Sequence, residues 1–170
     1  MRSIKKAQAW GFDLISAITI FIIGAVLFFM YSINYPKEGQ ETTEVLQYES
    51  NFIGESLLSE GYPKDWNENN VGRIGIVDNG RINQTKIERL YAMANYLSNP
   101  NGYQKAKSIF DTNHEFFFNL SIPITLSNGS QTSSGVGRNF ASQNPVNILK
   151  TTRITIYQNN PITLNLYIWN

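Results

Sequence analysis

The chain of 170 residues contains no cysteine and a single histidine, His114. Disulfide bonds, thiolate nucleophiles and cysteine-based metal sites are therefore excluded. One histidine without cysteine offers few ligands for a transition metal, so His114 is expected to be an ordinary surface or strand-end residue. The sequence also lacks a glycine-rich phosphate loop, a nucleophile elbow and a histidine-containing triad. These absences predict a protein without cofactor or metal and without enzymatic activity.

Charge is scarce and unevenly placed. Residues 14–36 carry no charged side chain, whereas the first thirteen residues carry Arg2, Lys5 and Lys6 against Asp13. From residue 37 onward, eleven Lys and Arg stand against twelve Asp and Glu. A nucleic-acid-binding surface needs a basic patch, and this chain has none of sufficient size. Nucleic acid is therefore not expected among its partners.

The uncharged run at residues 14–36 is 23 residues long. A helix needs about 20 apolar residues to cross a hydrocarbon core of about 30 Å, whereas a secretory signal has a core of only about 7–15. The sequence therefore predicts a transmembrane helix. Its positive charges lie on the N-terminal side, which predicts a cytoplasmic N-terminus and an extracellular C-terminal domain.

Lys5, Lys6, Ala7 and Gln8 directly precede this run, and the arrangement resembles the class III, prepilin-type signal of archaeal type IV pilin-like proteins. The resemblance implies that a prepilin-type peptidase cuts between Ala7 and Gln8 and that the retained helix later forms the core of a filament. It also implies an assembly role for Asp13, since an acidic residue near the new N-terminus sets the register of neighbouring subunits in such families. Asp13 is the sixth residue counted from Gln8, where the fifth is usual, and Ala7 stands in place of the commoner glycine.

Two simpler interpretations stay open. The helix can be a permanent single-pass anchor whose lysines only set its orientation. Asp13 can likewise be a flanking acid that reaches water at the membrane edge, where its charge is less costly than in the membrane centre.

The predicted organisation is a leader at residues 1–7, a transmembrane or assembly helix at 8–36 and an extracytoplasmic domain at 37–170. In that domain, helical spacing of apolar residues predicts a helix that opens at Thr42 or Thr43 and ends before Gly61. A short strand is expected over 71–77. Two further helices follow, one with an apolar stripe that runs from Ile87 to Leu97 and one over 103–110.

One block has a distinctive order: Gly61-x-Pro-x-x-Trp66, then Ile74-Gly-Ile76, then Asn83-x-x-Lys86 opening a helix. It resembles a recurrent block in uncharacterised archaeal pilin-like membrane proteins. The resemblance brings no known chemistry with it.

The last third of the chain is expected to be β. Apolar residues alternate over 116–126, and again around Ile154 and Ile156 and from Ile162 to Ile168, as in half-buried strands. Residues 127–137 read as a flexible loop, and residues 158–161 as the turn of a hairpin. Helices followed by consecutive strands predict an α+β domain, here a pilin-like head of short helices and an antiparallel sheet.

Few residues suggest a ligand. Asp65, Glu68 and Asp78 lie in loops where oxygen ligands could hold calcium, but their spacing does not match an EF-hand. Three sequons mark possible glycosylation sites on an outward-facing domain, at Asn83, Asn119 and Asn128.

The sequence thus predicts a non-enzymatic, membrane-anchored cell-surface protein, specifically a type IV pilin-like structural subunit, major or minor. Its expected partners are the membrane, further copies of itself or other pilin-like subunits, and the peptidase. The alternative is a permanently anchored single-pass surface protein whose head binds a partner.

Overall fold

The computed structural model describes residues 4–34, 38–127, 129 and 135–170. The chain forms two compact units, Met1–Glu41 and Thr42–Asn170. The second unit is called the head below.

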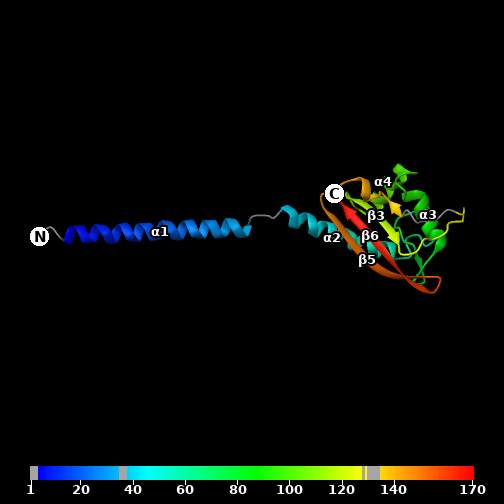
Figure 1. Ribbon diagram of the computed structural model, residues 1–170, viewed down its shortest axis with the longest axis horizontal. Coiled ribbons are helices and arrows are strands. Elements are labelled where there is room, and N and C mark those ends of the chain that lie inside the picture. The colour runs from blue at the N-terminus through cyan, green and yellow to red at the C-terminus, as the bar shows by residue number, and fades with distance from the viewer. Residues whose placement is uncertain (1–3, 35–37, 128, 130–134) are drawn as a thin grey trace. The chain divides into compact units, whose positions relative to one another are not determined.

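The first unit is dominated by α1, which spans Ile4–Asn34 (Figure 1). Proline is absent from this helix, and its last residue lies two positions before Pro36, a residue that cannot continue a helix. The hydroxyl of Thr19 donates to the carbonyl of Ile15 at 2.9 Å, so this polar side chain is satisfied within the helix itself. The long apolar helix predicted from the sequence is confirmed.

The second helix, α2, spans Glu38–Leu57 and therefore crosses the boundary between the units. It begins before Thr42 and Thr43, the residues predicted to cap it. In the head its buried side carries Leu46, Ile53 and Leu57, which belong to the hydrophobic core.

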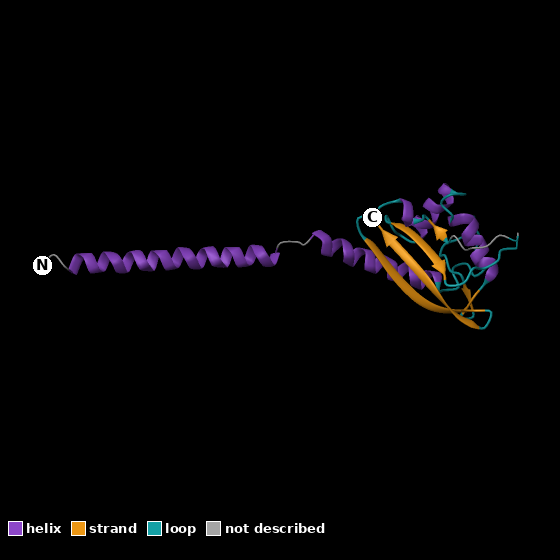
Figure 2. Ribbon diagram, viewed as in Figure 1, coloured by secondary structure: helices purple, strands orange, loops and turns teal. Residues whose placement is uncertain are grey.

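Six strands form one sheet in the order β1-β2-β5-β6-β3-β4, and helices pack against it (Figure 2). The strands are β1 (Val77–Asp78), β2 (Arg81–Ile82), β3 (Glu115–Leu120), β4 (Val136–Gly137), β5 (Ile148–Tyr157) and β6 (Asn160–Trp169). The predicted antiparallel sheet is wrong in one respect: β2 lies parallel to β5, with Arg81 opposite Ile156, so the sheet is mixed. The α+β class is confirmed.

The centre of the sheet is the predicted hairpin of β5 and β6, flanked by β3. Tyr157 pairs with Asn160, so the loop contains only Gln158 and Asn159. Both have positive φ, 48° and 66°, as the favoured two-residue hairpin turns require. The other edge of β6 pairs with β3 in antiparallel fashion, from Glu115 opposite Trp169 to Leu120 opposite Leu164.

Two short helices complete the core, and asparagine caps both. In α3 (Gln84–Ala94), the side chain of Asn83 accepts from the N–H of Lys86. In α4 (Pro100–Ile109), the side chain of Asn99 accepts from the N–H of Gly102. Each cap satisfies a donor that a helix start leaves without a partner. A 3-10 turn, η2 (Phe140–Ser142), follows β4. The core joins side chains of α2, α3, α4, β3 and β6 in one cluster.

Two predictions upstream of β3 are wrong. The strand expected over 71–77 does not form, and β1 begins only at Val77; before it, Ile76 donates its N–H to the carbonyl of Leu57 at the end of α2. The stripe expected to reach Leu97 ends at Ala94, and Leu97 is 90% exposed. The side chain of Asn95 accepts from the N–H of Leu97, a local turn that competes with further helix.

Two predictions around β3 also fail in part. The strand expected over 116–126 ends at Leu120, and Pro123, which lacks an N–H, lies in the irregular stretch that follows. The loop expected over 127–137 ends in β4, which pairs with β3 through Val136 and Gly137. The helix expected over 103–110 begins earlier, at Pro100.

The predicted alternation along β5 is present, but its isoleucines lie on the exposed side of the strand. Ile154 and Ile156 are exposed, while Thr155 and Tyr157 are buried. The inward residues of β5 meet α2: the hydroxyl oxygens of Ser50 and Thr151 lie 2.5 Å apart, and Arg153 donates to Asn51 at 2.8 Å.

Candidate functional site

The most distinctive feature of the molecule is the apolar surface of α1. Residues Gly11–Ile33 have a mean hydropathy of 2.5 and are long and apolar enough to cross a membrane, and no part of this stretch is buried within the chain. A secretory signal sequence near an N-terminus satisfies the same criteria. Contiguous exposed apolar surface of this extent is typical of segments that contact lipid or other helices.

The residues predicted for processing and assembly all lie in α1. Ala7 and Gln8 are within the helix, and their side chains lie outside the described part of the structure. Asp13 is exposed, two positions after the first residue of the apolar stretch. Its assembly role stays a prediction.

The block from Gly61 to Lys86 is closely packed and hydrogen-bonded. Trp66 is fully buried and donates its indole N–H to the carbonyl of Gly75 at 2.8 Å. A Cβ on Gly61 would lie 2.7 Å from the Trp66 ring, and one on Gly75 would lie 2.3 Å from the carbonyl oxygen of Ser59. Both positions therefore need the absence of a side chain.

The same block contains a buried cation. Lys86 is only 5% exposed, and its ammonium donates to the carbonyls of Glu60 and Val77 at 2.8 and 3.0 Å. Nearby, Arg89 donates to the carbonyls of Asp65 and Trp66. These contacts tie the loops after α2 to α3, so the order of residues in the block reflects packing and hydrogen bonding.

A hollow of about 510 Å³ adjoins this block. Its charges are largely matched, because Lys64 lies 2.8 Å from Asp78 and the two cations Lys86 and Arg89 are bound to backbone carbonyls. The hydrogen bond and charge of Lys64 lower the pKa of Asp78, and the same contact with Asp78 raises the pKa of Lys64. Of the predicted loop acids, Asp65 and Asp78 line this hollow.

A denser ionic cluster surrounds Glu115 at the start of β3. Lys107 lies 2.8 Å from one carboxylate oxygen, and Arg138 and the Tyr103 hydroxyl lie 3.3 and 3.0 Å from the other. Burial alone would raise the pKa of Glu115, but the hydrogen bond and charge of Lys107, with hydrogen bonds from Tyr103 and Arg138, outweigh it and lower that pKa. Burial also raises the pKa of Tyr103. A carboxylate held ionised by two cations is a structural anchor rather than a proton donor.

His114 pairs with an acidic residue of α2. Its Nδ1 lies 2.8 Å from Glu49 on α2, and the Thr112 hydroxyl donates to the same carboxylate. The contact fastens α2 to the loop before β3. Within residues 4–34, 38–127, 129 and 135–170, no three His, Asp or Glu side chains gather where they could hold a metal ion.

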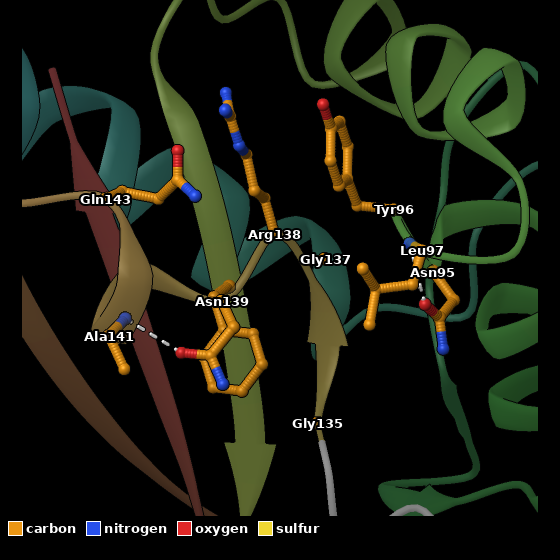
Figure 3. Close-up of a pocket in the computed structure, with 10 residues that line it drawn as sticks. Asn95, Tyr96, Leu97, Gly135, Gly137, Arg138, Asn139, Ala141 and Gln143 are labelled. Carbon is orange, nitrogen blue, oxygen red and sulfur yellow. Dashed lines mark hydrogen bonds between the residues drawn. The ribbon is translucent and has the colours of Figure 1, made fainter.

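A second hollow, of about 410 Å³, lies between the end of α3 and the segment after β4 (Figure 3). The guanidinium of Arg138 stands 4.8 Å from the centre of the Tyr96 ring, and the two side chains rise together from the rim in Figure 3. Two rim amides serve local turns: Asn95 accepts from Leu97 N–H and Asn139 from Ala141 N–H. The described residues that line it include no pair of nucleophile and base. Sequence reasoning missed it because its walls lie some forty residues apart.

The asparagines of the three sequons differ in their structural surroundings. Asn83 caps α3, with its side-chain oxygen occupied by the Lys86 N–H. Asn119 lies within β3, where its side-chain oxygen accepts from Asn165 at 3.2 Å. Asn128 lies outside the described residues. Use of these sequons as glycosylation sites stays a prediction.

Comparison of the chain with protein-family models, with curated proteins and with solved structures finds no match.

Proposed function

We propose that this chain is a type IV pilin-like structural protein, held in the membrane by α1 and acting through assembly of that helix with others. The observation that carries the proposal is the run Gly11–Ile33, whose large apolar side chains are exposed along its whole length. Burial of apolar surface contributes about 25 cal/mol per Å², so a helix of this kind gains stability in lipid or in a bundle. The head then faces outward and performs no catalysis.

In this proposal, removal of the leader at residues 1–7 controls assembly. Arg2, Lys5 and Lys6 precede the apolar stretch, and charged residues at that end keep it in the cytoplasm. Removing residues 1–7 leaves only Asp13 as a charged side chain ahead of Lys37. The helix beyond Asp13 can then bury its uncharged length against copies of itself.

The mature N-terminus, measured by mass spectrometry on protein purified from its native membrane, tests the proposal. We expect a chain that begins at Gln8. A chain that retains Arg2, Lys5 and Lys6 would instead support the alternative, a permanent anchor that carries a partner-binding head. The hollow beside Tyr96 and Arg138 is the observation that favours this alternative, since it is a concave surface that could receive a partner.

A further inference from the structure

A stripe of apolar side chains lies on α2, beside its buried side. Val45, Tyr48 and Phe52 recur at positions i, i+3 and i+7 and are all exposed, Tyr48 by 74%. This spacing places them along one face of the helix. We call these three residues the α2 stripe.

Acidic residues border the α2 stripe. The helix contains five glutamates and no Lys or Arg. Glu44 and Glu55 are exposed and share the face of Tyr48, four residues before it and seven after it. Two α2 stripes packed on each other would bring these carboxylates together, which disfavours a symmetric contact.

A second exposed apolar surface lies on the face of the sheet that is turned away from α2. Ile148, Ile154 and Ile156 are exposed on β5, with exposed Lys150 and Thr152 among them. The Lys150 ammonium lies 5.5 Å from the centre of the Tyr167 ring. Since Thr151 and Arg153 face α2, alternation along the strand places these five residues away from it. We call them the β5 row. Neither β5 nor β6 contains an acidic residue, and Lys150 is the cation on the outward side of β5, since Arg153 faces α2.

We propose that the α2 stripe of one copy packs on the β5 row of the next copy. Charge complementarity supports this pairing. The α2 stripe is apolar with an acidic border, whereas the β5 row is apolar with a cation, and each copy of the chain carries both surfaces. A contact between two different surfaces is heterologous, and it repeats from copy to copy without closing unless the rotation happens to form a ring. The inference rests on the proposed function, because it requires that copies of the chain assemble.

Cysteine cross-linking of the full-length chain in membranes tests the contact, and the absence of native cysteine keeps the background clean. Tyr48→Cys and Ile154→Cys chains with different tags are co-expressed and oxidised. We expect mixed Tyr48→Cys/Ile154→Cys dimers to exceed both homodimers. A chain that carries both substitutions should give a ladder of multimers. Gln47→Cys is the matched control on α2, exposed but off the stripe, and should cross-link poorly with Ile154→Cys.

Other occupants give other results. Predominant homodimers of either variant would indicate a symmetric contact and would overturn the proposal. The absence of mixed dimers, which is expected if lipid or another protein covers the α2 stripe, would also overturn it. Ile20→Cys on α1 separates this failure from failure of the proposed function. Disulfides between α1 helices without mixed head dimers would overturn only the head contact. The absence of both would overturn assembly as well.

A charge exchange provides a second readout. Glu55→Lys and Lys150→Glu should each lower the yield of mixed dimers by roughly two- to five-fold, the range expected for exposed ion pairs. With Glu55→Lys on the Tyr48→Cys chain and Lys150→Glu on the Ile154→Cys chain, opposite charges again face each other across the contact, and the yield should be restored. Equal loss in the single and the combined exchanges would contradict the assigned charge pairing.

Discussion

Trp66 donates its indole N–H to the carbonyl oxygen of Gly75 at 2.8 Å, and no part of the Trp66 side chain reaches solvent. The hydrogen bond requires the backbone of Gly75 to lie against the chain that follows α2. A side chain at position 75 would meet the carbonyl oxygen of Ser59 at 2.3 Å. The two residues therefore hold the loops between α2 and α3 as one packed unit.

Gly75→Ala is expected to destabilise the head by about 1–3 kcal/mol, because the added methyl group collides with backbone. Gly72→Ala is the matched control, since a Cβ there meets Tyr62 only at an ordinary 3.6 Å. Thermal unfolding of the detergent-solubilised chain measures the difference. Equal stability of the two variants would contradict the packing described for Gly75.

Loss of the Asn83 cap is expected to cost about 1 kcal/mol, because the first turn of α3 loses its acceptor for the Lys86 N–H. Asn83→Ala removes both the cap and the sequon, whereas Thr85→Val removes the sequon alone. Chemical denaturation of both variants separates the two effects. A stability loss in Thr85→Val as large as in Asn83→Ala would indicate that the sequon, and not the cap, matters.

The ion pair of Lys107 and Glu115 should make the stability of the head depend on pH. Because the folded pKa of Glu115 is lowered from 4.5, its contribution is present above about pH 4.5 and is lost as the pH falls through the lower folded value. The Glu115→Gln variant should therefore have a lower free energy of unfolding than the unchanged chain at pH 7. This difference in free energy should become smaller towards pH 3. Unfolding midpoints measured at the two pH values test the sign, and a gap that widens on acidification would contradict it.

Asp13→Ala is expected to abolish filaments while membrane insertion continues, if the exposed carboxylate aligns neighbouring helices. Electron microscopy measures filaments, and membrane fractionation measures insertion. Asp13→Glu keeps the charge and should retain assembly at least in part. Normal filaments from Asp13→Ala would leave Asp13 as a flanking acid only.

Periodicity predicted the larger elements of the fold. The apolar helix, the β5–β6 hairpin and the first part of β3 all follow from apolar spacing, which reports burial directly. The strands β1, β2 and β4 contain two residues each, too few to show a period, and the parallel join of β2 to β5 depends on tertiary contact.

The arrangement of side chains was harder to foresee. Glu49 and His114 are 65 residues apart, and the walls of the Tyr96 hollow come from separate segments. The alternation of Ile154 and Ile156 identified a strand correctly, but alternation alone does not say which face α2 covers. Local patterns therefore predicted the elements, and the contacts between them decided which surfaces are exposed.

Between β3 and β4, the chain is held in place at Ser127 and again at Val136. The backbone N–H and the hydroxyl of Ser127 both donate to the carboxylate of Glu88, and Val136 pairs with Phe118. Lengthening a connection whose ends are already fixed costs little, about 0.6 kcal/mol for each doubling. An epitope inserted at Gly129, which is exposed and where an added Cβ would meet nothing within 4 Å, would therefore show by antibody labelling of intact cells whether the head is displayed on their surface.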